Sequence, residues 1–136
     1  MTNLNIDVLQ QELFENIFLK LQDYLPSNWV KIDFFASKTS GSYGIKYFVY
    51  NKDGKWVDCF NLVDIKEIKN LFYLIGKDIS TVWEQLPKQN KWYSFNLVID
   101  NQGNLKVDYD YADNIKEEEL FSYLFNKQKQ WSAKFK

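Results

Sequence analysis

The sequence predicts an α+β fold: an antiparallel β-sheet of about five strands, ordered broadly as a meander, with helices packed mainly on one face. Two observations predict it. In residues 29–60 and 92–111, apolar and polar side chains alternate with the period of two that half-buried strands have. In residues 7–25, 64–86 and 114–136, apolar side chains recur every three or four residues, as in amphipathic helices. Hairpin-connected strands with helices between them favour this class.

The N-terminal helix is predicted at Asp7–Leu25, with Leu13, Ile17 and Leu21 on its apolar stripe. Pro26 ends it, because proline cannot continue a helix and disfavours helical geometry at the residue before it. A first strand is predicted at Trp29–Ser37, where apolar residues alternate with polar and aromatic ones.

Two further strands are predicted at Tyr43–Tyr50 and Lys55–Phe60, joined by a turn that contains Asp53-Gly54, a strong hairpin signal. Aromatic side chains fill both faces of these strands. We therefore expect a sheet that helices cover on one face and that carries exposed or partner-facing rings on the other.

The middle helix is predicted at Asp64–Leu86, with Asp64 and Glu67 at the spacing of a capping box. Gly76 is expected to kink or break this helix, and Ser80 to cap a second segment. The last helix is predicted at Asn114–Lys136. Asn114 is expected to cap it, with Glu117–Glu119 in the first turn, where the helix dipole favours negative charge. Its predicted apolar stripe consists of Leu120, Phe121, Leu124, Phe125, Gln128, Trp131 and Phe135.

The central hairpin, Trp92–Asp113, turns at Asn101–Asn104, where Gly103 can take the positive φ of a tight loop. On the return strand Leu105–Tyr111, the apolar residues share one face, and Lys106, Asp108 and Asp110 share the other. We expect one core that buries Leu13, Ile17, Leu21, Phe95, Leu97, Val107 and Tyr109 together.

Composition excludes several functions. The 136 residues suit a single domain over residues 1–136, with 18% aromatic residues, no Arg, no His and a net charge of −1. These counts argue against a nucleic-acid partner and against histidine-based catalysis. The lone Cys59 makes a poor nucleophile without histidine. No cofactor or metal is expected. Residues 1–11 lack a signal-peptide pattern and no apolar run reaches membrane-spanning length, so we expect a cytoplasmic protein with no membrane partner.

The aspartates of the hairpin are the main candidate for function, because strands gain little from aspartate. Asp108 and Asp110 project from one face about 7 Å apart, Asp113 follows them, and Asp100 lies on the other strand. Three interpretations are open: a solvated edge, a divalent cation site, and an acidic surface that binds a cationic partner. The candidate partner-binding residues are Asp100, Asp108, Asp110, Asp113, Tyr111 and Trp92.

Two other groups of residues are weaker candidates. Aromatic residues on the strands resemble a base-stacking platform, but the charges between them are mixed and core packing explains most of them. Asp33 and Asp58 could act as the carboxylate pair of a glycosidase only if their carboxyl groups lay at a suitable distance. Their positions in the sequence do not determine that distance.

The chain resembles the YezG-like antitoxin family, which includes the EsaG-type immunity proteins of type VII secretion. The matching segments are Ile17–Trp29, Phe34–Ala36, Ser42–Tyr50 with Asp53-Gly54, Trp92–Tyr111 with its DYDY sequence, and Gln130–Lys134. The resemblance implies an antitoxin, not an enzyme, that neutralises the nuclease domain of a secreted toxin. The alternatives are a small metal-dependent hydrolase that uses Asp108 and Asp110, and a regulatory interaction module with no toxin partner.

Overall fold

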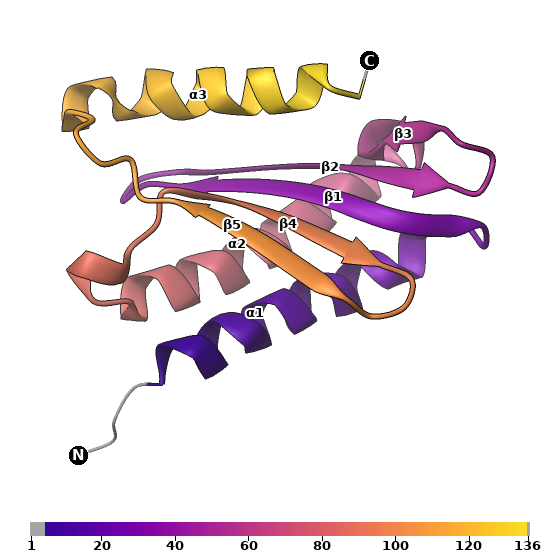
Figure 1. The fold of residues 1–136 in the computed structure, drawn as a ribbon, viewed down its shortest axis with the longest axis horizontal. Coiled ribbons are helices and arrows are strands. Elements are labelled where there is room, and N and C mark those ends of the chain that lie inside the picture. Colours follow the sequence, from indigo (N-terminus) through magenta and orange to yellow (C-terminus); the bar gives the residue numbers. More distant parts are fainter. Residues whose placement is uncertain (1–4, 136) are drawn as a thin grey trace.

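The computed structural model describes residues 5–135, which form three α-helices and one five-stranded antiparallel sheet (Figure 1). The α+β prediction is therefore confirmed. The helices are α1 (Ile6–Leu21), α2 (Ile65–Gln85) and α3 (Glu117–Ala133). The strands are β1 (Trp29–Lys38), β2 (Tyr43–Asn51), β3 (Trp56–Asp58), β4 (Ser94–Asp100) and β5 (Leu105–Asp110). No helix in the described part of the chain is long and apolar enough to cross a membrane.

The strand order in the sheet is β3-β2-β1-β4-β5, so β1 lies at the centre and β5 at an edge. Consecutive strands pair as antiparallel neighbours within the β1–β3 run and within the β4–β5 hairpin. Helix α2 carries the chain back across the sheet, and β4 then pairs with β1 in a register that places Leu97 opposite Phe34. The predicted meander order therefore holds within each run of strands, whereas β4 pairs with β1 and not with β3.

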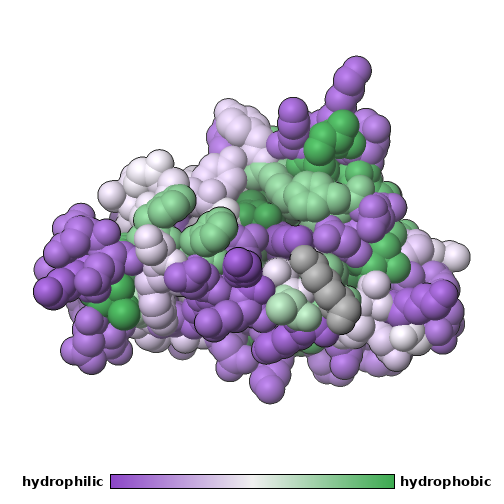
Figure 2. Space-filling view, turned by 90° about the horizontal axis from the view of Figure 1, so that it is seen from above, coloured by the Kyte–Doolittle hydropathy of each residue, from purple (hydrophilic) through white to green (hydrophobic). Residues whose placement is uncertain are grey.

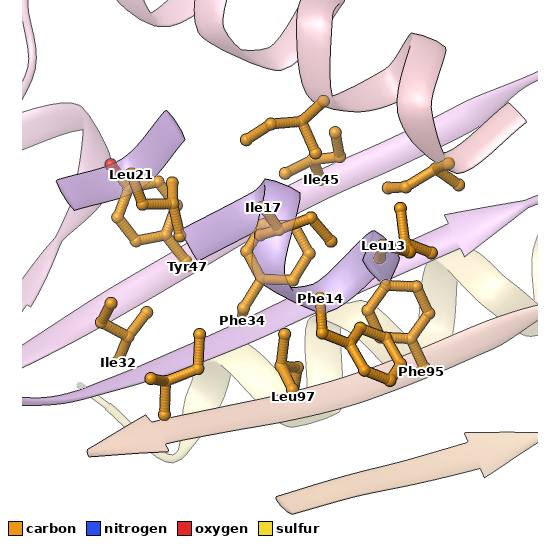
Figure 3. Close-up of a cluster of buried hydrophobic side chains, with 14 of the residues drawn as sticks. Leu13, Phe14, Ile17, Leu21, Ile32, Phe34, Ile45, Tyr47, Phe95 and Leu97 are labelled. Carbon is orange, nitrogen blue, oxygen red and sulfur yellow. The ribbon is translucent and has the colours of Figure 1, made fainter. Parts of the chain in front are cut away.

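The main core lies between the sheet and the α1–α2 pair (Figure 3). Of the seven residues predicted to be buried together, five are fully buried: Leu13, Ile17, Leu21, Phe95 and Leu97. Val107 and Tyr109 are half-buried and pack against the same core. The predicted face assignment of the central hairpin is thus confirmed.

The C-terminal helix lies on the opposite face of the sheet from α1 and α2 (Figure 1), so the expectation of all three helices mainly on one face is wrong for α3. The physical reason is that β1 and β2 carry large apolar residues on both faces. Phe35 and Phe48 point away from the main core and form a second cluster with Trp131, against which Trp56 and Phe135 pack. Burying these rings requires an element on this second face of the sheet, and α3 is that element.

Gly76 does not break the middle helix, because α2 is continuous through it and Ser80 lies inside the helix. A Cβ added at Gly76 would meet the ring of Tyr43 at 2.4 Å, so close packing of that ring accounts for the glycine. Asp64 is the N-cap as predicted, and its side chain accepts a hydrogen bond from the backbone N–H of Lys66 at 3.3 Å. The reciprocal Glu67 bond of a capping box is not found among the described residues.

The start of α3 differs from the prediction. Lys116, not Asn114, holds the N-cap position, and the three glutamates Glu117–Glu119 occupy the first turn as expected. Asn114 has φ 66° and Ala112 has φ 51°, both left-handed conformations that reverse the chain between β5 and α3. The predicted end of this helix at Lys136 lies outside the described residues.

Candidate partner-binding surface

The hairpin aspartates lie on the α3 face of the sheet. Within β5, Asp108 pairs with Asn96 of β4 and Asp110 pairs with Ser94, so both side chains stand on the face opposite the main core. Because β5 is an edge strand, this corner of the sheet is open to solvent wherever α3 does not cover it.

Asp110 attaches α3 to the sheet. Its carboxylate accepts hydrogen bonds from the Tyr123 hydroxyl at 2.5 Å, from the backbone N–H of Ala112 at 2.9 Å and from the Lys127 ammonium group. Burial by itself raises the pKa of Asp110, but these donors outweigh it and lower the pKa below its ordinary value. The expectation that Asp110 points freely outward is wrong, since the helix that covers this face could not be placed from the strand pattern alone.

Replacing Asp110 by Asn is expected to lower the free energy of unfolding by about 1–3 kcal/mol, because it removes charge-assisted hydrogen bonds to Lys127 and Tyr123. The folded pKa of Asp110 lies below its ordinary value of 3.8, so its contribution is present above about pH 4 and is lost as the pH falls through the folded pKa. The difference between wild type and variant should therefore shrink below about pH 4.

Urea denaturation from pH 7 down to pH 3 measures this difference. Asp108→Asn is the matched control, since Asp108 lies on the same strand and face, is exposed, and takes part in none of the ion pairs formed by residues 5–135. An Asp110→Asn variant as stable as Asp108→Asn at pH 7 would show that this attachment contributes nothing.

Asp100 belongs to the hairpin turn. Its carboxylate accepts hydrogen bonds from the backbone N–H groups of Gln102 and Asn104 and from the Asn104 side chain, each at 2.9 Å. The Asn104 side-chain bond is the main reason that the pKa of Asp100 is lowered. Asp100 therefore stabilises the tight loop at the far end of the hairpin from Asp110 and Asp113.

The two aromatic candidates differ. Trp92 is completely buried, its ring centroid lies 4.8 Å from that of Phe95, and its Nε1–H donates to Gln10 Oε1 at 2.8 Å. Trp92 is therefore a core residue that a partner cannot reach in this structure, because the main core extends under the start of β4. Tyr111 is 41% exposed beside Tyr109 and stays accessible.

We term the exposed acidic residues of β5 and of the start of α3 the acidic surface: Asp108, Asp113, Glu117, Glu118 and Glu119. Four of these five lie in the segment that leaves β5 and opens α3. Beside Asp108, a groove of about 300 Å³ separates α3 from the sheet, and Lys127 and Lys134 line it together with Asn96. The groove is mixed in charge, whereas the residues from Asp113 to Glu119 are mainly acidic.

The other candidate residues, Asp33, Asp58 and Cys59, have structural roles in the fold. Asp33 accepts hydrogen bonds from Trp131 Nε1–H at 3.0 Å and from the Asn96 amide at 2.5 Å. Asp58 caps a short 3₁₀-helix at Cys59–Asn61 that replaces the end of the predicted third strand, and it pairs with Lys46 at 3.4 Å. Burial raises the pKa of the Cys59 thiol to about 12, which keeps it protonated at neutral pH.

Metal-ligand geometry is missing from the hairpin. Within residues 5–135, no three Asp, Glu or Cys side chains gather closely enough to hold a metal ion. Asp110, which the cation interpretation needs beside Asp108, is already engaged by Lys127. The cation interpretation of the hairpin aspartates therefore gains no support from their geometry.

The predicted apolar stripe of the last helix is wrong for two aromatic residues. Phe121 and Phe125 belong to the predicted apolar stripe of the last helix, yet they are 70% and 59% exposed, whereas Leu124 and Trp131 of the same stripe are buried. Their spacing of four residues places them together on one side of α3. Whether a residue of this stripe is buried or exposed depends on how α3 lies on the sheet, which the helical spacing does not specify.

The half-buried carboxylates of Asp33, Asp58, Asp100 and Asp110 are thus hydrogen-bonded within the fold, and other acidic residues are exposed at the surface. A family model described as "Immunity protein YezG-like" matches residues 10–134. The chain is also similar to the immunity protein YezG of Bacillus subtilis (strain 168), with 24% identity over 123 residues, covering 83% of this chain and 80% of the relative. The chain belongs to the YezG-like immunity protein family.

Family membership confirms the resemblance drawn from the sequence. It gives the protein the role of an antitoxin that binds a cognate toxin protein. It also agrees with the prediction that the protein is not an enzyme, because immunity proteins of this kind act by binding.

Proposed function

We propose that this antitoxin binds and neutralises the nuclease domain of a secreted bacterial toxin, and that it does so in the cytoplasm of a cell that exports the toxin by type VII secretion. The observation that carries the proposal is the acidic surface of Asp108, Asp113 and Glu117–Glu119. Domains that cleave DNA are basic around their active sites, since they must attract phosphates. Opposite charge on the inhibitor steers the two proteins together and suppresses wrong partners.

The acidic residues at the start of α3 suit this role because they form none of the ion pairs within residues 5–135. Asp113 and Glu117–Glu119 are exposed, and the only ion pairs among residues 5–135 involve other carboxylates, those of Asp58, Asp78 and Asp110. Like charges crowded on one surface repel one another, and a basic partner relieves that repulsion.

The test measures association of the purified protein with the nuclease domain of a candidate cognate toxin, together with inhibition of DNA cleavage. Replacing Asp108 and Asp113 by Asn is expected to slow association about three- to tenfold at low salt and to weaken its salt dependence. Thermal unfolding should not change, because both side chains are exposed.

The matched control replaces Glu12 and Asp23 by Gln and Asn. Both are exposed residues of the N-terminal helical region on the other side of the sheet, and the change in net charge is the same. If the control variant associates as slowly as the Asp108→Asn, Asp113→Asn variant, the effect is due to net charge alone and not to the acidic surface. A wild-type protein that neither binds the nuclease domain nor inhibits cleavage would overturn the proposed function.

A further inference from the structure

The N-terminal half of α3 exposes an apolar surface that the fold does not use. Phe121 and Phe125 are largely exposed and lie four residues apart on this helix. Seen from above in Figure 2, the α3 side of the molecule shows hydrophobic side chains gathered between hydrophilic ones. Single exposed apolar residues are common, but neighbouring aromatic rings on one helix face mark an interaction surface.

The surface is hollowed on both sides of Phe121. One hollow, of about 410 Å³, lies between α3 and the segment before it and is lined by Trp83, Tyr93, Ile115 and Leu120. A smaller hollow, of about 120 Å³, is lined by Tyr43, Gly44, Leu124 and Phe125. Thr39 and Phe121 line both hollows, so the two adjoin. We term them together the α3 groove.

Acidic side chains border the apolar part of the groove. Glu117 lines the larger hollow, and Glu118, Glu119 and Asp113 are exposed residues of the same turn and its approach. An apolar centre with aromatic anchors and a charged rim is the anatomy of a protein–protein interface. The carboxylates at the α3 end of the groove favour a partner that presents basic side chains around an apolar one, whereas Lys38 and Lys91 lie over the ring of Trp83.

We infer that the α3 groove is where the nuclease domain docks, with an apolar side chain of that domain seated beside Phe121 and its lysines or arginines facing Glu117–Glu119. This inference rests on the proposed function and names the contact surface for it. A second copy of this chain is the alternative occupant that the test must exclude.

The test replaces Phe121 and Phe125 by Ala, which removes both rings and favours the helix at both positions. Affinity for the toxin's nuclease domain is expected to fall at least about tenfold, mainly through faster dissociation, with thermal unfolding unchanged because both side chains are exposed. The control replaces Leu19 of α1 and Tyr73 of α2, each 55% exposed, by Ala and should retain wild-type affinity.

The outcomes separate the two proposals. If wild type binds the nuclease domain and the Phe121→Ala, Phe125→Ala variant binds it equally well, the α3 groove is not the contact and the proposed function stands. If wild type does not bind that domain, the proposed function falls and the inference falls with it. If sedimentation shows a wild-type dimer that the double variant dissociates, the occupant is a second copy and the inference is overturned.

Discussion

Replacing Leu97 by Ala is expected to lower the free energy of unfolding by about 2–5 kcal/mol. Leu97 is completely buried on β4, between Phe34 of β1 and Val107 of β5, under the α1 side of the sheet (Figure 3). Truncation removes apolar contacts on several sides, and the rigid neighbouring strands prevent the cavity from closing.

Chemical denaturation measures this loss, and the next residue on the strand is the control. Val98 is half-buried and points to the opposite face, where it pairs with Asp33 and Lys106. Val98→Ala should cost about 1 kcal/mol or less, within the range of strand propensity. A Leu97→Ala midpoint equal to that of wild type would mean that the two faces of the hairpin are assigned the wrong way round.

Replacing Trp131 by Ala is expected to cost about 3–5 kcal/mol and to release the C-terminal half of α3 from the sheet. The indole ring lies 5.3 Å from the ring of Phe35 and 5.4 Å from that of Phe48, measured between centroids, and Trp131 is only 6% exposed. Truncation would expose both phenylalanines and leave Asp33 without its indole donor.

Hydrogen exchange of α3 amides and denaturation midpoints test this prediction together. Trp131→Phe is the control, because it keeps an aromatic ring in the cluster and removes the hydrogen bond to Asp33 with only part of the ring volume, at an expected cost of about 1–2 kcal/mol. Unchanged exchange protection in α3 with Trp131→Ala would show that the remaining contacts, those of Asp110 and Leu124 among them, hold the helix without the indole ring.

Short-range patterns in the sequence determined which segments form helices and strands. The period of two in β4 placed Phe95 and Leu97 in the main core. Asp64 was recognisable as a cap from Glu67 three residues further on, and the N–H that it binds, that of Lys66, is also a near neighbour in the sequence. The matching segments spread along the chain likewise identified the family, which residues 10–134 bear out.

Only the tertiary structure decided where α3 lies, and with it the state of each candidate site residue. An alternating pattern tells which strand residues share a face, but it does not tell what covers that face. Asp110 became an attachment point and Asp108 stayed exposed because the donors that reach Asp110, Tyr123 and Lys127, come from a helix 13 and 17 residues further along the chain. Trp92 was buried and Phe121 left exposed for the same reason: burial depends on contacts between distant segments, which the helix and strand periodicities do not contain.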